Sequence, residues 1–146
     1  MHNKQDENAG NLGDVAKHAA LVALGSLILE RLRGDASLSW LDSHAYLLET
    51  TPRAPVEQWR RDLEGLGAAG EAVAVYRGLE EAAYARGRYL CSSGLIAALG
   101  GARVRYHLAE RHEATRLKLA EQLAAQGLSP TCLLTEASAF ASIGGE

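Results

Sequence analysis

Three polar side chains follow a short apolar run in the segment SWLDSHAYLLE, residues 39–49. The run contains Trp40 and is followed by Asp42, Ser43 and His44, so the segment is interpreted as a buried strand that ends at a polar corner. In α/β proteins, small ligands bind outside the carboxyl ends of the strands. A carboxylate, a hydroxyl and an imidazole can hydrogen-bond a small molecule there, so this corner is a candidate ligand site.

The residues after this corner are unfavourable for such a site. A backbone that approaches a ligand closely needs residues without a Cβ atom, but the continuation AYLLE contains no glycine. Tyr46, Leu47 and Leu48 are bulky. We therefore expect these side chains to fill the space beside the corner or to force the loop onto a different path.

Helical and strand patterns alternate along the chain. Apolar spacing and stop residues predict helices over residues 14–33, 54–67, 71–87 and 111–127, a short helix within 89–101, and strands over 37–44, 102–110 and 129–137. Such alternation implies parallel strands joined by right-handed helical crossovers. The predicted fold class is α/β, with a small three-stranded parallel sheet flanked by helices.

The composition is that of one ordinary globular domain, residues 1–146. Apolar residues make up 47% and charged residues 23% of the chain, which excludes a disordered protein. The formal net charge of −3 lacks the basic excess of most nucleic-acid-binding surfaces, so nucleic acid is not an expected partner. Small arginine groups such as Arg86 with Arg88 are interpreted as solvated surface, with a phosphate site as the alternative.

The cysteines and the N-terminal segment indicate the compartment. Cys91 and Cys132, in a chain without an apolar signal core, indicate reduced thiols and a cytoplasmic protein. The longest apolar stretch, AALVALGSLIL, is too short to span a bilayer, so no membrane association is expected. No Cys/His spacing resembles a zinc site. His107, Glu110 and His112 would diverge at a strand-to-helix corner, so no metal is expected.

Several motifs together resemble one bacterial family. The segment NAGNLGDVAKH, the following helix and the strand ending LDSHA are similar to the start of the S-adenosylmethionine-dependent adenine-N6 methyltransferases that act on large-subunit ribosomal RNA. These enzymes open with H-A-G-N-x-A-D-V-x-K-H and have a first strand ending D-T-H-A-G-x-G. LCSSGLIAAL, YHLAERHEATRLKL and TEASAF resemble the family's P-G-S-P-x-x-A segment, its second strand with a terminal acidic residue, and its A-D-G segment. The resemblance is collinear over about residues 8–140.

The resemblance implies a cofactor site and a Rossmann-like fold. The residues that fall on family positions around S-adenosylmethionine are Lys17, His18, Asp42, His44, Ser93 and Glu110. A lysine or histidine can bind the carboxylate of this cofactor, and Glu110 at a strand end can accept hydrogen bonds from its ribose. Other interpretations remain open: Lys17 as a solvated helix residue, His18 and His44 as structural histidines, and Glu110 as a surface partner of Arg111.

The chain departs from the family pattern where the reaction takes place. The D-P-P-Y motif, which holds the flipped target adenine in the family, is absent, and the three prolines, Pro52, Pro55 and Pro130, are not adjacent. Ser138 replaces the aspartate of the A-D-G segment. No catalytic residue is therefore predicted. The chain is expected to be a truncated, Rossmann-like methyltransferase half that does not catalyse, with S-adenosylmethionine or another small molecule as an optional ligand.

A half-sheet of this kind needs a partner. The first strand would lie at an open edge, and its apolar residues require cover. A homodimer that joins two half-sheets, edge to edge or by an exchanged N-terminal helix, is the expected solution. Two alternatives remain: a cofactor-binding methyltransferase fragment that a second polypeptide completes, and an unrelated α/β interaction module.

Overall fold

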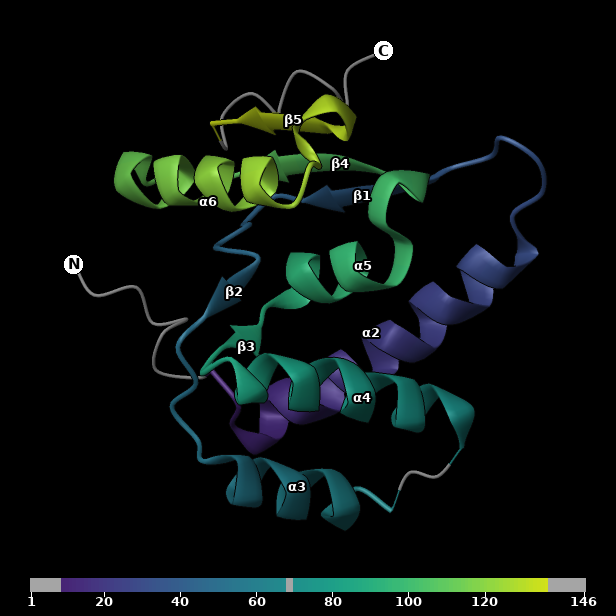
Figure 1. Ribbon diagram of the computed structural model, residues 1–146, viewed down its shortest axis with the longest axis vertical. Helices are drawn as coiled ribbons and strands as arrows, with labels where there is room; N and C mark the ends of the chain where they lie inside the picture. Colours follow the sequence, from purple (N-terminus) through teal and green to yellow (C-terminus); the bar gives the residue numbers. More distant parts are fainter. Residues whose placement is uncertain (1–8, 68–69, 137–146) are drawn as a thin grey trace.

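The computed structural model describes residues 9–67 and 70–136 (Figure 1). Its helices are α2 (Leu12–Arg31), α3 (Val56–Gly65), α4 (Glu71–Ala85), α5 (Ser92–Gly100) and α6 (Glu113–Ala125), with short 3-10 turns at Gly101–Arg103 and Ser129–Thr131. Its strands are β1 (Leu38–Asp42), β2 (Glu49–Thr50), β3 (Tyr89–Leu90), β4 (Val104–Ala109) and β5 (Cys132–Thr135). Ser138 and the end of the chain lie outside the described residues.

The sheet confirms the predicted fold class. Strands β1, β4 and β5 form a three-stranded parallel sheet in the order β1-β4-β5, so β1 is an edge strand of the described sheet. In the register, Trp40 lies opposite Tyr106, and Leu108 lies opposite Leu134. The protein is therefore an α/β domain with a small parallel sheet flanked by helices, in the general Rossmann-like arrangement.

One face of the sheet is packed and the other is open. Val104, Tyr106 and Leu108 of β4 are fully buried, together with apolar side chains of α5 and α6. On the opposite face, Leu41 and Leu133 flank His107 in adjacent strands. Leu41 is 57% exposed and Leu133 is 49% exposed. The alternation along these strands thus separates a core face from a face without cover in the described chain.

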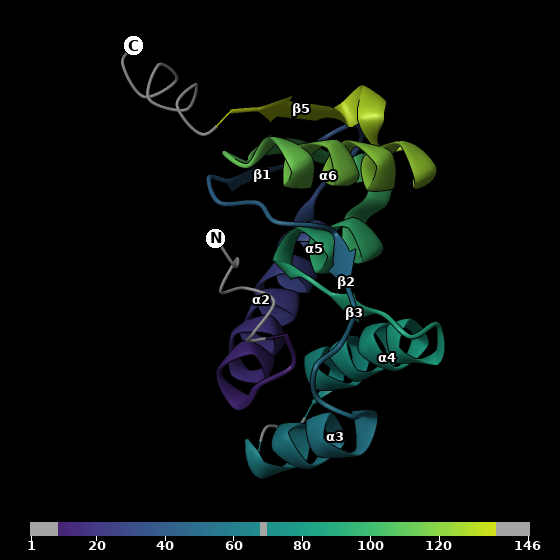
Figure 2. The same ribbon diagram turned by 90° about the vertical axis from the view of Figure 1, so that its left-hand side faces the viewer.

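A second layer of helices lies beside the sheet layer. Helices α2, α3 and α4 enclose a separate core with Trp59, Tyr76 and Tyr89 at its centre. The antiparallel ribbon of β2 and β3 runs between the two layers, as the two views show (Figures 1 and 2). Each strand of the ribbon has two residues, which is too short for an alternating pattern, and sequence analysis did not predict it.

Capping and packing define the boundaries and faces of two helices. The side chain of Asn11 caps α2, since its oxygen accepts a hydrogen bond from the main-chain N–H of Asp14 at 2.9 Å. In α6 only part of the apolar side chains is buried. Leu119 and Leu123 are buried, whereas Leu117 is 60% exposed. The helical period of the sequence is compatible with burial of either face of this alanine-rich helix, and packing against the sheet determines which face is buried.

The apolar character of α2 was underestimated. Its 20 residues have the length and composition of a membrane-crossing helix, contrary to the expectation that no segment is long enough. In the fold, Val15, Val22 and Leu29 are buried, and the helix packs against α3, α4 and α5. One face of α2 therefore packs in the core while Leu24 and Leu27 are exposed, and the composition of one helix is weak evidence for a membrane.

Candidate functional site

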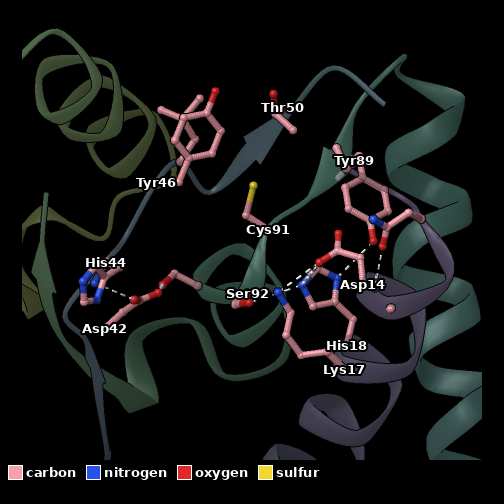
Figure 3. Close-up of a pocket in the computed structure, with 15 residues that line it drawn as sticks. Asp14, Lys17, His18, Asp42, His44, Tyr46, Thr50, Tyr89, Cys91 and Ser92 are labelled. Carbon is pink, nitrogen blue, oxygen red and sulfur yellow. Dashed lines mark hydrogen bonds and ion pairs between the residues drawn. The ribbon is translucent and has the colours of Figure 1, made fainter. Parts of the chain in front are cut away.

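A cavity of about 580 Å³ lies at the carboxyl end of β1 (Figure 3). It is enclosed by the first turns of α2, the loop after β1, strand β2 and the start of α5. Its lining residues are Ala9, Asn11, Gly13, Asp14, Lys17, His18, Asp42, His44, Tyr46, Leu47, Thr50, Tyr89, Cys91, Ser92 and Ser93. Asp42 and His44 lie on one side of the close-up, and Asp14, Lys17 and His18 lie on the other. We call this the main cavity.

Three charged or titratable groups project from one face of α2. Asp14 Oδ1 is 3.0 Å from Lys17 Nζ and 3.7 Å from His18 Nε2. The ring of His18 is also fixed by Tyr89, whose hydroxyl is 3.1 Å from Nδ1, and by Ser92, whose Oγ is 3.2 Å from Nε2. The helical spacing i, i+3 and i+4 places all three groups on the cavity side.

The electrostatics of this face leave His18 uncharged at neutral pH. Burial lowers the pKa of His18 to about 4, and the neighbouring Asp14 only partly opposes this effect. Burial would raise the pKa of Asp14, but the charges of His18 and Lys17 lower it below its ordinary value. Hydrogen bonds from Lys17 and from the main-chain N–H of Gly10 also lower the pKa of Asp14. The face therefore offers a carboxylate, an ammonium group and a neutral imidazole.

The opposite wall is organised around Asp42. Asp42 Oδ2 accepts a hydrogen bond from Ser93 Oγ at 2.9 Å, and Ser93 Oγ accepts one from Trp40 Nε1 at 2.9 Å. Asp42 Oδ1 accepts a hydrogen bond from the main-chain N–H of His44 at 3.1 Å. Ser43 Oγ lies 2.8 Å from Nδ1 of the exposed His44. These contacts orient the Asp42 carboxylate at the end of β1.

The loop after β1 leaves the polar corner open. Leu48 is fully buried and belongs to the core beneath the sheet, while Tyr46 and Leu47 line the cavity wall. The main-chain N–H of Ala45 donates to the carbonyl of Ala109, which ties the loop to β4. Of the two expected alternatives, the structure therefore shows the reshaped loop: Leu48 turns into the core, and Tyr46 and Leu47 form part of the cavity wall.

Gln122 of α6 holds the far end of this loop. Its Oε1 accepts hydrogen bonds from the main-chain N–H groups of Leu48 at 2.7 Å and Glu49 at 3.2 Å. Its Nε2 donates to the carbonyl of Glu49 at 2.9 Å. One amide side chain thus satisfies three backbone groups that have no strand partner for these bonds.

The glycine needed for close backbone contact lies in α5 instead of the loop. The carbonyl of Leu48 accepts a hydrogen bond from the main-chain N–H of Cys91. It passes so close to Gly94 that a Cβ atom there would lie 1.8 Å from the oxygen. Gly94 therefore allows α5 to approach the loop after β1 closely, and it is not one of the residues that line the main cavity.

The structure brings five of the six predicted ligand residues together. Lys17, His18, Asp42, His44 and Ser93 line the main cavity, whereas Glu110 does not. Glu110 is buried, and its Oε1 accepts a hydrogen bond from the main-chain N–H of His112 at 2.8 Å. It also makes no ion pair with Arg111 among the described residues, so the surface pair is not seen. Within residues 9–67 and 70–136, no group of acidic, histidine or cysteine side chains could hold a metal.

Other lining residues were missed by the sequence analysis. Asp14 lies one helical turn before His18 and could have been found from this spacing. Tyr89 lies 71 positions from His18, and no motif in the sequence around it indicates that the two side chains are in contact. Cys91 also lines the cavity, and burial raises the pKa of its thiol to about 12. Cys91 and Cys132 are both free thiols, and at neutral pH Cys91 is a protonated, weakly reactive group.

Comparisons with known proteins support the fold. No family model and no curated protein matches the chain. Among solved structures, protein LPL1258 from Legionella pneumophila strain Philadelphia 1, described under the family model DUF519, is similar with a TM-score of 0.65 and 16% sequence identity. The match covers 87% of this chain and 48% of that chain, so this chain spans about half the length of the structure that it matches. At this identity the similarity shows the fold alone.

Proposed function

We propose that this domain binds a small molecule related to S-adenosylmethionine in the main cavity and does not itself transfer a methyl group. The observation that carries the proposal is that Lys17, His18, Asp42, His44 and Ser93 line a single cavity. The resemblance to adenine-N6 methyltransferases marks the same five residues, although it uses sequence motifs and no spatial information. The free thiols Cys91 and Cys132 favour a reducing compartment such as the cytoplasm.

The charged side chains of the cavity suit a ligand that carries one negative and one positive group. A ligand carboxylate can bind near Lys17 and the start of α5, because the first amide N–H groups of a helix have no partner within it. A ligand ammonium group can bind near Asp14 or Asp42. Ribose binding by Glu110 requires its carboxylate to leave the N–H of His112. Methyl transfer is not proposed, since the sequence lacks the D-P-P-Y motif.

Calorimetric titration with S-adenosylmethionine and S-adenosylhomocysteine tests this function. The unmodified protein is expected to bind at least one of them. Lys17→Ala should weaken binding on the order of tenfold, because it removes a charge-assisted contact. His44→Ala should weaken it less, because this exposed side chain forms one rim of the cavity. Arg33→Ala is the matched control, since it removes an exposed positive charge beyond α2.

The result with no heat for either ligand would contradict the proposal. An equal effect of Arg33→Ala and Lys17→Ala would also contradict it, because a general change of charge would then explain the loss. Glu110→Gln provides a further distinction. Weaker binding in this variant would support the ribose contact that the resemblance implies, and unchanged binding would restrict Glu110 to its hydrogen bond with His112.

We further propose that a second copy of the chain covers the β1 edge. The observation that favours this assembly is that, among the described residues, β1 pairs with β4 alone, and that Leu41 beside this edge is exposed. Parallel sheets are normally covered on both faces, and an apolar edge strand promotes pairing with another chain. A different polypeptide that supplies the missing strands is the alternative, and it would leave the purified chain monomeric.

Light scattering coupled to size-exclusion chromatography measures this assembly directly. The unmodified chain is expected to elute with the mass of a dimer. Leu41→Lys should shift the population to monomer, because a dimer would have to bury the new charge. Leu117→Lys is the control, since Leu117 is as exposed but lies on α6. A monomeric unmodified chain, or dissociation by Leu117→Lys alone, would refute the β1 interface.

A further inference from the structure

A second cavity lies beside the main cavity. It has a volume of about 520 Å³. Tyr46, Leu47 and Thr50 line both cavities, so the two spaces are adjacent and share part of their walls. We call the second cavity the cationic groove, because its charged lining residues are Arg53, Arg88 and Lys118.

The charge of the groove differs from that of the chain. Among the described residues, its lining includes three cationic side chains and no acidic one, whereas the whole chain has a formal net charge of −3. Arg53 and Lys118 are exposed, and neither forms an ion pair among the described residues. Their charges are therefore available to a ligand. An ordinary solvent-exposed surface is expected to carry acidic and basic side chains in a mixture.

Arg88 is held in place by its neighbours. Its Nε atom is 3.2 Å from Glu49 Oε1, and its Nη2 atom donates to the carbonyl of Glu49 at 3.4 Å. Arg86 Nη2 binds the other carboxylate oxygen of Glu49 at 3.0 Å. Two guanidinium groups thus share one carboxylate, which leaves a net positive charge at this end of the groove. A guanidinium that is already positioned loses less conformational entropy when it binds an anion.

The floor of the groove is also fixed. Gln122, which binds the backbone of Leu48 and Glu49, is itself a lining residue of the groove. Lys118 lies one turn before Gln122 on α6, so the same helix positions both the amide of Gln122 and the ammonium group of Lys118. Arg53 is tied to the rest of the fold through its main-chain N–H, which donates to the carbonyl of Ala9 at 3.3 Å. The three cations therefore come from three separate segments and converge on one space.

We infer that the cationic groove is an oxyanion site for the phosphate group of a phosphorylated small molecule whose other part lies in the main cavity. A phosphate ester carries nearly two negative charges and three acceptor oxygens, which matches three cations around one space. The main cavity, with its hydroxyl groups and the carboxylates of Asp14 and Asp42, suits the hydroxyl-bearing part of such a ligand. This last point rests on the proposed function, whereas anion binding in the groove does not.

Ribose 5-phosphate, ribose and inorganic pyrophosphate are suitable probes for the full chain. Isothermal titration should detect binding of ribose 5-phosphate and pyrophosphate, but not of ribose. Arg53→Ala and Lys118→Ala should each weaken binding on the order of fivefold, and Lys118→Arg should retain most of it. Arg33→Ala removes the same charge at the end of α2 and should leave binding unchanged. Binding should also weaken as the salt concentration rises.

The outcomes separate this inference from the proposed function. Binding of ribose 5-phosphate that depends on Arg53 and Lys118 supports the groove, even in a protein that does not bind S-adenosylmethionine. Pyrophosphate binding without ribose 5-phosphate binding would overturn the assignment to a phosphate ester. Absence of binding by both anions, or an equal loss in Arg33→Ala, would overturn the oxyanion site itself.

Discussion

Gly94→Ala is expected to destabilise the protein by about 3 kcal/mol or more, because the new methyl group meets rigid backbone. The Cβ atom would lie 1.8 Å from the carbonyl oxygen of Leu48 and 2.7 Å from its carbon atom. That carbonyl also accepts the hydrogen bond from the N–H of Cys91, so it cannot move without breaking this bond. Relief of the clash would require α5 to shift away from the loop after β1.

Urea denaturation followed by the fluorescence of the buried Trp59 measures this effect. Gly78→Ala is the matched control, because Gly78 lies within α4 and no heavy atom is within 4 Å of its added Cβ atom. This control should stabilise the protein by about 0.5–1 kcal/mol through helix propensity. A Gly94→Ala variant within about 0.5 kcal/mol of the unmodified protein would contradict the described approach of the two segments.

The second large effect is a fall in stability between pH 6.5 and pH 8 that Glu80→Gln removes. Glu80 is fully buried, its Oε2 atom accepts a hydrogen bond from the N–H of Leu90, and its Oε1 atom has no partner. Burial raises the pKa of Glu80 to about 8, and the hydrogen bond from Leu90 offsets only part of this increase. The nearby carboxylate of Asp14 raises it further.

The direction of the pH dependence follows from these pKa values. Between pH 4.5 and pH 8 the folded protein keeps the proton of Glu80, whereas the unfolded chain has lost it, so stability falls as the pH rises. His18 has the opposite effect between pH 4 and pH 6.5, where the unfolded chain is protonated and the folded protein is not. The two effects oppose each other up to about pH 6.5. Above that pH, Glu80 alone remains.

Equilibrium unfolding across this pH range checks the prediction. The unmodified protein should lose on the order of 2 kcal/mol between pH 6.5 and pH 8, and Glu80→Gln should show little change there. Glu81→Gln, at the adjacent and partly exposed position that pairs with Arg60 at 3.0 Å, should keep the profile of the unmodified protein. A profile that is identical in Glu80→Gln and the unmodified protein would assign the pH dependence to other groups.

The parallel sheet could be predicted from the sequence because its strands carry a clear pattern. In β4 the side chains of Val104, Tyr106 and Leu108 alternate with Arg105 and His107, and the structure buries the first three. The ribbon of β2 and β3 could not be predicted in this way. Its four residues pair only because the loop after β1 and the turn before α5 meet in space.

The candidate site could be predicted in part. Asp42 was found because it follows a predicted strand, whereas Lys17 was assigned only through the resemblance to the methyltransferase family. Tyr89 and the phenol–imidazole contact with His18 depend on tertiary packing between distant segments. The sequence could not specify the path of the loop after β1 for a related reason, since Gly94 lies in a different element and its role becomes visible only beside Leu48.

The clamp formed by Gln122 has a consequence for how this protein can diverge. Inserting one residue into α6 ahead of Gln122 would turn its amide by about 100° around the helix axis, away from the backbone of Leu48 and Glu49. Related sequences that retain the cavity wall should therefore tolerate length changes before α6 or after it, but not within its first turns. Changes of length in the loop after β1 and in the first turns of α6 are therefore expected to occur together in related sequences.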